Sequence, residues 1–481
     1  MSSVLFIALP LLFGFATPIL SRFGKNGVAF TSLAMQLFLL FLAFTLIGDK
    51  PYIEIISIAP PLGISFVLNN ISLFFVTLFT FLMVAFSIYY LSYRKTDAYK
   101  NETKFFILLN MLLASAIGLV LSSDIFNVYV FFEIAGISAY ILTAYKKTPS
   151  ALEAGIKYLL TGSIASIFLV FAIILIYLNI GSLNLAIIAQ DFETLPYNLK
   201  VFISILFLIG FGFKVEIFPL NFWVSDVYEG STALVNSLFS GIVVKAYLFA
   251  FFHILYLFLP SGEFSTFLIY LGAISMIIAE IVALKQTNLK RVFAYSSLGQ
   301  VALIFTAFAL QSIDAIQGAL FIILAHSIAK IVIFLALTTI EKNYKSLDIN
   351  VLKELNAPFL RVVIVIAMLS LLGIPLFAGF IGKFLVLKAF AVEQIFPILA
   401  IIIIASLLEA VYYFKLIGFM FEKGDRKDKI KVDFTHKFIF SLLTFLILLV
   451  GITPFVISGF LLDSANVMLD SISYIAMLVK G

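Results

Sequence analysis

Long apolar segments follow one another along almost the whole chain, and they constrain its fold more than any other feature. A helix that crosses a bilayer needs about 20 mostly apolar residues, and about fourteen such segments occur, separated by short polar breaks. Because 63% of the 481 residues are hydrophobic and only 12% are charged, the chain lacks the polar surface that a water-soluble globule needs. We therefore predict an all-α membrane protein with about fourteen transmembrane helices. The predicted spans are 2–21, 28–47, 69–92, 104–122, 125–145, 155–179, 199–219, 231–259, 264–285, 292–310, 313–340, 360–388, 395–421 and 437–462.

The segment from Tyr52 to Val67 departs from this series. It holds Pro60 and Pro61 among β-branched residues, which disfavours a helix. We expect an external loop or a hairpin there.

The basic residues predict the orientation of the spans. Of the 31 Lys and Arg residues, 22 fall in odd-numbered loops and only Lys50, Lys200 and Lys388 in even-numbered ones. Cytoplasmic loops carry the excess of positive charge, so the odd loops are predicted to be cytoplasmic and both termini outside. The expected location is the cell membrane, and the spread of the basic residues argues against nucleic acid binding.

The chain contains no cysteine, which excludes disulfides, thiolate-ligated zinc and cysteine-held iron–sulfur clusters. No phosphate-binding loop, metal site or cofactor motif is visible either, so we expect no cofactor and a non-redox chain. Any redox chemistry would belong to a partner.

Three short matches suggest an internal repeat. Ser163–Ile167 resembles Ser327–Ile331, and Lys214 and Lys245, with their surroundings, match Lys383 and Lys415 at offsets of 169 and 170 residues. Two five-helix units related by inverted topology would explain the order of these matches. Chance coincidence of short apolar strings is the alternative. The predicted organisation is 1–103 (helices 1–3), 104–259 (first repeat), 264–421 (second, inverted repeat) and 422–481 (helix 14 and tail).

Glycine and proline accompany two of the matched lysines. Lys214 lies near Gly212 and Pro219, and Lys383 follows Pro375 and Gly379. Since both residue types weaken a helix, we predict that the seventh and twelfth helices are interrupted, with a lysine at each break.

Charged residues inside the apolar spans are the candidate machinery, because burying a charge in lipid is costly and such residues mark ion pathways. A line of alternating acids and bases across the membrane suits proton relay. For Lys415, Glu280, Glu216 and His253 we favour structural roles: snorkelling to the interface for the first two, capping of a helix break for Glu216 and core packing for His253. The candidate relay residues are Glu133, Lys214, Lys245, His326, Lys330 and Lys383.

At these residues the chain resembles the antiporter-like subunits of complex I and of Mrp-type multisubunit sodium/proton antiporters, over nearly its whole length. Lysine at Lys383 favours the N-like or D-like form, and related subunits occur in membrane-bound hydrogenases and sulfane reductases. The matching strings are SDIFNVYVFFE (Ser123–Glu133), GFGFKVEIFPLNFW (Gly210–Trp223), GIVVKAY (Gly241–Tyr247), LKRVFAYSSLGQVA (Leu289–Ala302), LAHSIAKIVIFL (Leu324–Leu335) and GIPLFAGFIGKF (Gly373–Phe384).

The resemblance implies a role for each candidate. Glu133 and Lys214 look like the family's input ion pair, and Lys245 like the lysine at the centre of the hydrophilic axis. His326 and Lys330 look like its relay pair, and Lys383 like its exit lysine. Other membrane subunits, protons and sodium ions are the implied partners.

The chain departs from the family after Lys214. Asn221 and Tyr228 stand where the family usually has histidines, although Asp226 is kept. The implied input route is therefore altered, or replaced by water, Asp226 and Glu229.

These observations favour an ion-translocating subunit of a larger complex, which moves protons or couples protons to sodium. A stand-alone secondary transporter of a small solute is the main alternative. A membrane-embedded enzyme has no nucleophile and base to support it, and a scaffold that retains ancestral charges remains open.

Overall fold

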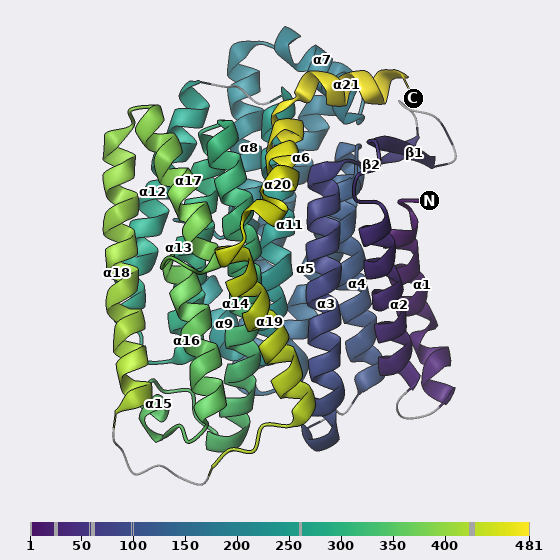
Figure 1. Ribbon diagram of the computed structural model, residues 1–481. Coiled ribbons are helices and arrows are strands. Elements are labelled where there is room, and N and C mark those ends of the chain that lie inside the picture. The colour runs from purple at the N-terminus through teal and green to yellow at the C-terminus, as the bar shows by residue number, and fades with distance from the viewer. Residues whose placement is uncertain are drawn as a thin grey trace.

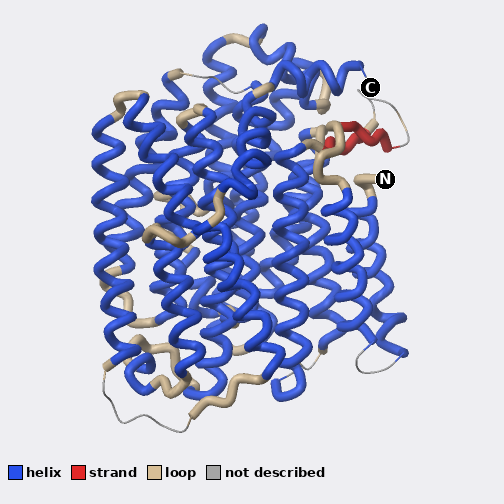
Figure 2. Tube along the Cα trace, in the orientation of Figure 1, coloured by secondary structure: helices blue, strands red, loops and turns tan. Residues whose placement is uncertain are grey.

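Helices make up nearly all of the protein. The structure is a computed structural model that describes residues 2–23, 27–56, 58, 63–97, 99, 101–258, 262–422 and 429–480. Within these residues, twelve helical segments are long and apolar enough to cross a membrane, and they run roughly side by side (Figure 2). They are α2 (Gly27–Thr45), α3 (Asn70–Asp97), α4 (Glu102–Leu121), α5 (Ile125–Thr143), α6 (Pro149–Ile180), α8 (Tyr197–Val215), α10 with η4 and α11 (Ala233–Leu238, Phe239–Val243, Val244–Phe258), α12 (Glu263–Ala283), α13 (Leu289–Ala309), α14 (Ile313–Tyr344), α18 (Phe396–Phe421) and α19 (Phe434–Ile452).

The other two predicted spans are shorter helices. The first is α1 (Leu5–Leu20), and the twelfth is divided into α16 (Pro358–Leu372) and α17 (Ala378–Val392). The all-helical membrane architecture is thus confirmed, whereas the count of fourteen and the two inverted repeats stay predictions.

Both predicted interruptions are present. The helix α8 ends at Val215, where Glu216 adopts a left-handed conformation with φ 66°, and the chain resumes as the short helix α9 (Val224–Gly230). The helix α16 ends at Leu372, followed by the C-cap residue Gly373, whose φ of 78° suits a residue without a side chain, and α17 begins at Ala378. The two breaks bring irregular backbone close to Lys214 and Lys383.

A third break was not predicted. The expected last span, 437–462, is interrupted at Thr453 and Pro454, between α19 and α20 (Phe455–Leu469). Proline has no amide hydrogen to donate to the preceding turn, which explains why α19 ends there. The chain then bends by 71° from α20 into α21 (Ser471–Lys480).

One end of the bundle carries both chain ends and the only described β-strands. The strands β1 (Tyr52–Ile56) and β2 (Ile64–Leu68) pair antiparallel, which confirms a hairpin. The hairpin lies near the start of α1 and, with α21 and α7 (Leu185–Asp191), covers this end (Figure 1).

The opposite end is here called the basic end. It holds the C-terminal end of α3 and the short helix α15 (Val351–Glu354) (Figure 1), together with the turns η1 (Ser21–Phe23) and η2 (Ala144–Lys146). Described basic residues of the odd-numbered loops, such as Arg94, Lys146 and Lys345, lie here. The turn η3 (Phe192–Thr194) follows α7 at the other end. The charge asymmetry seen in the sequence is therefore an asymmetry between the two ends of the bundle.

The helix α14 lies at the centre of the packing. It contacts α3, α10, α13, α16, α17, α19 and α20, and its residues from Ala315 to Ile340 are almost all buried. The helices α1 and α2 form one edge of the bundle and α18 the other (Figure 1). Polar residues on α14 are thus enclosed by protein on all sides, which places His326 and Lys330 far from lipid.

Candidate functional site

The six predicted relay residues lie on five helices, and five of the six are buried. Lys330, Lys245, His326 and Lys214 are at most 2% exposed, and Lys383 is 7% exposed. Glu133, on α5, is half-buried. Because each buried cation is costly to dehydrate, its immediate contacts decide what it can do.

Lys214 is enclosed by aromatic side chains in the last turn of α8. Its ammonium donates a hydrogen bond to the hydroxyl of Tyr140 and lies 4.5 Å from the centre of that ring and 5.1 Å from the ring of Tyr158. Aromatic faces attract a desolvated cation. Two glycines make room for this arrangement, since a Cβ atom at Gly136 or Gly162 would lie 3.1 or 2.9 Å from the Lys214 nitrogen.

The predicted ion pair between Glu133 and Lys214 is not in contact. Among the described residues Glu133 forms no ion pair, and its Oε1 is buried without a hydrogen-bond partner. The ammonium of Lys214 therefore contacts the Tyr140 hydroxyl and not the Glu133 carboxylate that was expected.

The centre of the site joins α11 to α14. Lys245 Nζ lies 2.8 Å from Nδ1 of His326, and it also donates to the carbonyl oxygen of Ser240. Ser240 belongs to η4, a stretch of π-helix, and such widened turns are frequent at functional sites. His326 Nε2 is buried without a partner among the described residues. This second ring nitrogen is therefore free to donate or accept a further hydrogen bond.

Glu216 is a buried carboxylate that the relay prediction left out. It occupies the C-cap position at the end of α8, as expected, but it is only 3% exposed and its Oε2 has no described hydrogen-bond partner. A buried carboxylate therefore follows Lys214 by two residues at the break after α8.

Lys330 continues the line one helical turn after His326. Its ammonium donates to the carbonyl oxygen of Phe293 (2.9 Å) and to Ser296 Oγ (2.7 Å), both on α13. Ser296 is hydrogen-bonded in turn to the hydroxyl of Tyr413 on α18. Hydroxyl groups both donate and accept, so this pair extends the line towards α18.

Lys383 ends the line in a buried ion pair with Glu409. The distance from Nζ to Oε2 is 2.7 Å, and Lys383 also donates to the carbonyl oxygen of Leu372 at the break between α16 and α17 (3.2 Å). Gln300 donates to both carboxylate oxygens of Glu409, at 2.8 and 2.9 Å. Sequence reasoning did not predict Glu409 as this partner, although it is the only charged residue between Phe396 and Phe414.

Of the residues predicted to have structural roles, Lys415 and His253 behave as expected and Glu280 does not. Lys415 is exposed on α18, as expected of a snorkelling lysine, and His253 stacks on Phe249 and packs edge-on against Tyr474. Glu280 does not reach the surface, so the snorkelling prediction is wrong for it. It is 2% exposed and accepts a hydrogen bond from Tyr412 (2.8 Å), because close packing against Gly299 of α13 encloses it.

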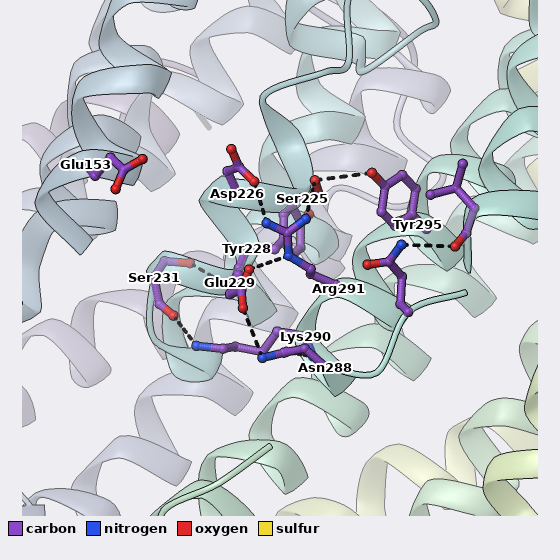
Figure 3. Close-up of polar contacts among 12 residues, drawn as sticks. Glu153, Ser225, Asp226, Tyr228, Glu229, Ser231, Asn288, Lys290, Arg291 and Tyr295 are labelled. Atoms are coloured by element: carbon purple, nitrogen blue, oxygen red, sulfur yellow. Dashed lines mark hydrogen bonds and ion pairs between the residues drawn. The ribbon is translucent and has the colours of Figure 1, made fainter. Parts of the chain in front are cut away.

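An ion-pair network at the basic end includes the two acids proposed as a replacement input route. Arg291, in the first turn of α13, pairs with both Asp226 and Glu229 of α9 (Figure 3). Lys157 pairs with Asp226 at 2.8 Å. Partial burial raises the pKa of Asp226, but the hydrogen bond from Lys157 and the charge of Arg291 outweigh it, so the pKa lies below its usual value.

The same network ties the two halves of the chain together. Lys290 donates to the carbonyl oxygen of Ser231 (2.9 Å), and Asn288 donates to Glu229 (3.3 Å) (Figure 3). Asp226 and Glu229 therefore form ion pairs with basic groups and hold α9 against α13.

The fold and the site define a class of protein: a multi-span membrane protein with buried acids and bases on several of its helices. Residues 122–409 match the family model described as NADH:quinone oxidoreductase/Mrp antiporter, transmembrane. The chain belongs to this family.

Curated relatives agree with this assignment. NADH-quinone oxidoreductase subunit N of Desulfitobacterium hafniense is 30% identical over 77% of this chain and 79% of that protein. Subunit N of Anoxybacillus flavithermus is 33% identical over 71% of this chain and 70% of its own length.

Solved structures show the same fold. A chain of the membrane-bound sulfane sulfur reductase, an archaeal respiratory membrane complex, is 31% identical, with a TM-score of 0.93 over 99% of both chains. A chain of the Mrp complex from Dietzia sp. has a TM-score of 0.89 over 99% of both chains at 19% identity, a likeness of fold alone. These neighbours are subunits of multisubunit membrane complexes. The comparisons do not favour the alternative of a stand-alone transporter.

Proposed function

We propose that this chain translocates protons, or couples proton to sodium movement, as a membrane subunit of a larger complex, with other membrane subunits as its partners. The observation that supports this most strongly is the line of buried groups from Lys214 through Lys245, His326 and Lys330 to Lys383. Its five members come from four helices, α8, α11, α14 and α17, so the line runs across the bundle rather than along one helix. Each buried ammonium has a hydrogen-bond acceptor, which a relay of protons between neighbouring groups requires.

The direct contact between Lys245 and His326 supports a relay in particular. Nitrogen atoms 2.8 Å apart form a hydrogen bond only if one donates a proton and the other accepts it. A proton can therefore pass between them without a water molecule. Energy would come from an electron-transfer module or from an ion gradient elsewhere in the complex, and not from this chain.

Substitution of the lysines tests the proposal. The assembled complex should be reconstituted in vesicles, and proton movement should be followed with a pH-sensitive dye. We expect Lys214→Ala and Lys383→Ala to abolish proton translocation. Lys415→Ala is the matched control, because Lys415 also lies within a spanning helix but is exposed, and it should leave translocation unchanged. Undiminished translocation in both axis variants would contradict the proposal.

We also propose that the basic end faces the cytoplasm and that both termini face outward in the cell membrane. The excess of lysine and arginine at that end supports this orientation. Because the chain has no cysteine, single cysteines can report it. Cysteine at Ile472 should react with an impermeant maleimide on intact cells, and cysteine at Lys345 only after permeabilisation. The reverse pattern would contradict the orientation.

A further inference from the structure

A cleft at the basic end lies outside the line of relay groups. Its volume is about 990 Å³, and its walls come from α3, α4, α5, α6 and α14. Five lysines line it, against two carboxylates, those of Asp97 and Glu341. The lysines are Lys104, Lys146, Lys147, Lys342 and Lys345. The cleft therefore carries an excess of positive charge.

Both carboxylates already have partners. Asp97 accepts a hydrogen bond from the Tyr93 hydroxyl at 2.6 Å, and Glu341 lies 3.8 Å from the ammonium of Lys290. Within the described residues, no carboxylate forms an ion pair with Lys146, Lys147 or Lys345, and all three are exposed. Their charges are thus available to an anion that enters the cleft.

The wall on the bilayer side is apolar. Ile141 of α5 and Leu152 of α6 line the cleft and are 47% and 44% exposed. Ile107 and Leu108 of α4 extend this surface. Because α4, α5 and α6 are spanning helices, exposed apolar side chains on them meet acyl chains and not water.

We propose that this cleft binds an anionic diacyl phospholipid, with its phosphate among Lys146, Lys147 and Lys345 and its acyl chains along Ile141 and Leu152. Basic pockets between spanning helices suit acidic head groups. A free phosphate would use only the lysines, and an acidic polypeptide would not need an apolar wall at the level of the bilayer. The lipid accounts for both the lysines and the apolar wall of the cleft. This binding site does not depend on the proposed ion translocation.

Lipid retention tests the proposal. The full-length chain, in its complex, is purified in detergent with added phosphatidylglycerol or phosphatidylcholine, and bound lipid is measured by native mass spectrometry. We expect the triple variant Lys146→Gln, Lys147→Gln and Lys345→Gln to bind phosphatidylglycerol at least about tenfold more weakly than the unchanged chain. The variant Lys429→Gln, Lys431→Gln and Lys437→Gln makes the same change of charge outside the cleft and should bind normally.

A second measurement does not depend on the variants. In the unchanged chain, raising the salt concentration should weaken the binding of phosphatidylglycerol, because screening acts on exposed charges, and should not affect phosphatidylcholine. Glycerol phosphate at the same concentration should displace little of the lipid, since it lacks acyl chains.

Four results would overturn the proposal. They are equal phosphatidylglycerol binding in both triple variants, equal affinity for the two lipids, full displacement by glycerol phosphate, and loss of a neighbouring subunit from the cleft variant with lipid binding unchanged. The third result would indicate a site for free phosphate, and the fourth an interface between proteins.

Discussion

Lys245 and His326 are in direct contact at the centre of the bundle, with 2.8 Å between Nζ and Nδ1. Both groups are bases, so a positive charge on both at once is repulsive in a site of low polarity. The pair therefore holds one proton more favourably than two. When a second proton reaches the pair from either side, the repulsion between the two charges is expected to favour release of the first proton to the next group.

We predict that Lys245 and His326 act as one unit. Lys245→Ala and His326→Ala should each abolish proton translocation, and the double variant should be no worse than either. In thermal unfolding, the two substitutions should be non-additive by about 0.5–3 kcal/mol, as expected of residues in contact. Strictly additive effects on stability would show that the two side chains do not interact.

We predict that removing the charge of Glu409 destabilises the protein. Glu409→Gln leaves Lys383 buried without its partner, and breaking a buried ion pair costs about 3–5 kcal/mol. Replacing both residues with methionine should recover much of the lost stability, because neither charge then needs burial. The double variant should not translocate protons, because it lacks Lys383. Recovery of translocation there would exclude Lys383 from the relay.

We predict that Gly162→Ala disrupts the surroundings of Lys214. A Cβ atom at this position would lie 1.8 Å from the Tyr140 hydroxyl oxygen and 2.9 Å from the Lys214 nitrogen, so both groups have to move. Translocation should fall sharply, although alanine favours helix by about 1 kcal/mol over glycine. Gly418→Ala is the matched control, since nothing lies within 4 Å of its added Cβ. Equal activity of the two variants would contradict this prediction.

We predict a pH-dependent contribution of Asp226 to stability. Its pKa in the folded protein is lowered, because the hydrogen bond from Lys157 and the charge of Arg291 outweigh the effect of burial. The carboxylate therefore stabilises the fold at neutral pH, and this contribution is lost as the pH falls through the lowered pKa.

The measurement is the unfolding temperature of Asp226→Asn against the unchanged chain. The variant should unfold at a lower temperature at pH 7, by the modest amount expected of partly exposed ion pairs, and the difference should shrink below about pH 4. Asp49→Asn, a change at an exposed aspartate before the hairpin, should have no effect at either pH. A difference that grows on acidification would contradict the assignment of the ion pairs.

The sequence predicted those parts of the fold that depend on local chemistry. Apolar runs identified the spans, and glycine and proline identified the breaks near Lys214 and Lys383. A titratable residue inside an apolar helix is conspicuous, so all six candidates could be named before any contact was known. The break at Pro454 was missed because a single proline within a long apolar run was read as part of a continuous helix.

The partners of the candidates were harder to predict. Tyr140 and Tyr413 are ordinary residues of apolar helices. Only the three-dimensional structure shows that their hydroxyls meet Lys214 and Ser296. Glu409 was visible as a charge, but its pairing with Lys383 depends on two helices meeting at one depth. Tertiary adjacency of this kind leaves no local signal in the sequence.

Three of the buried lysines are held by the same kind of hydrogen bond. Lys245, Lys330 and Lys383 each donate to a main-chain carbonyl oxygen, those of Ser240, Phe293 and Leu372. A carbonyl oxygen is supplied by every amino acid, so these anchors survive when the residue that bears them is exchanged. Most of the surrounding side chains can then change in evolution while the ammonium groups keep their positions. This agrees with the comparison to the sulfane sulfur reductase chain, whose backbone matches at a TM-score of 0.93 although only 31% of the sequence is identical.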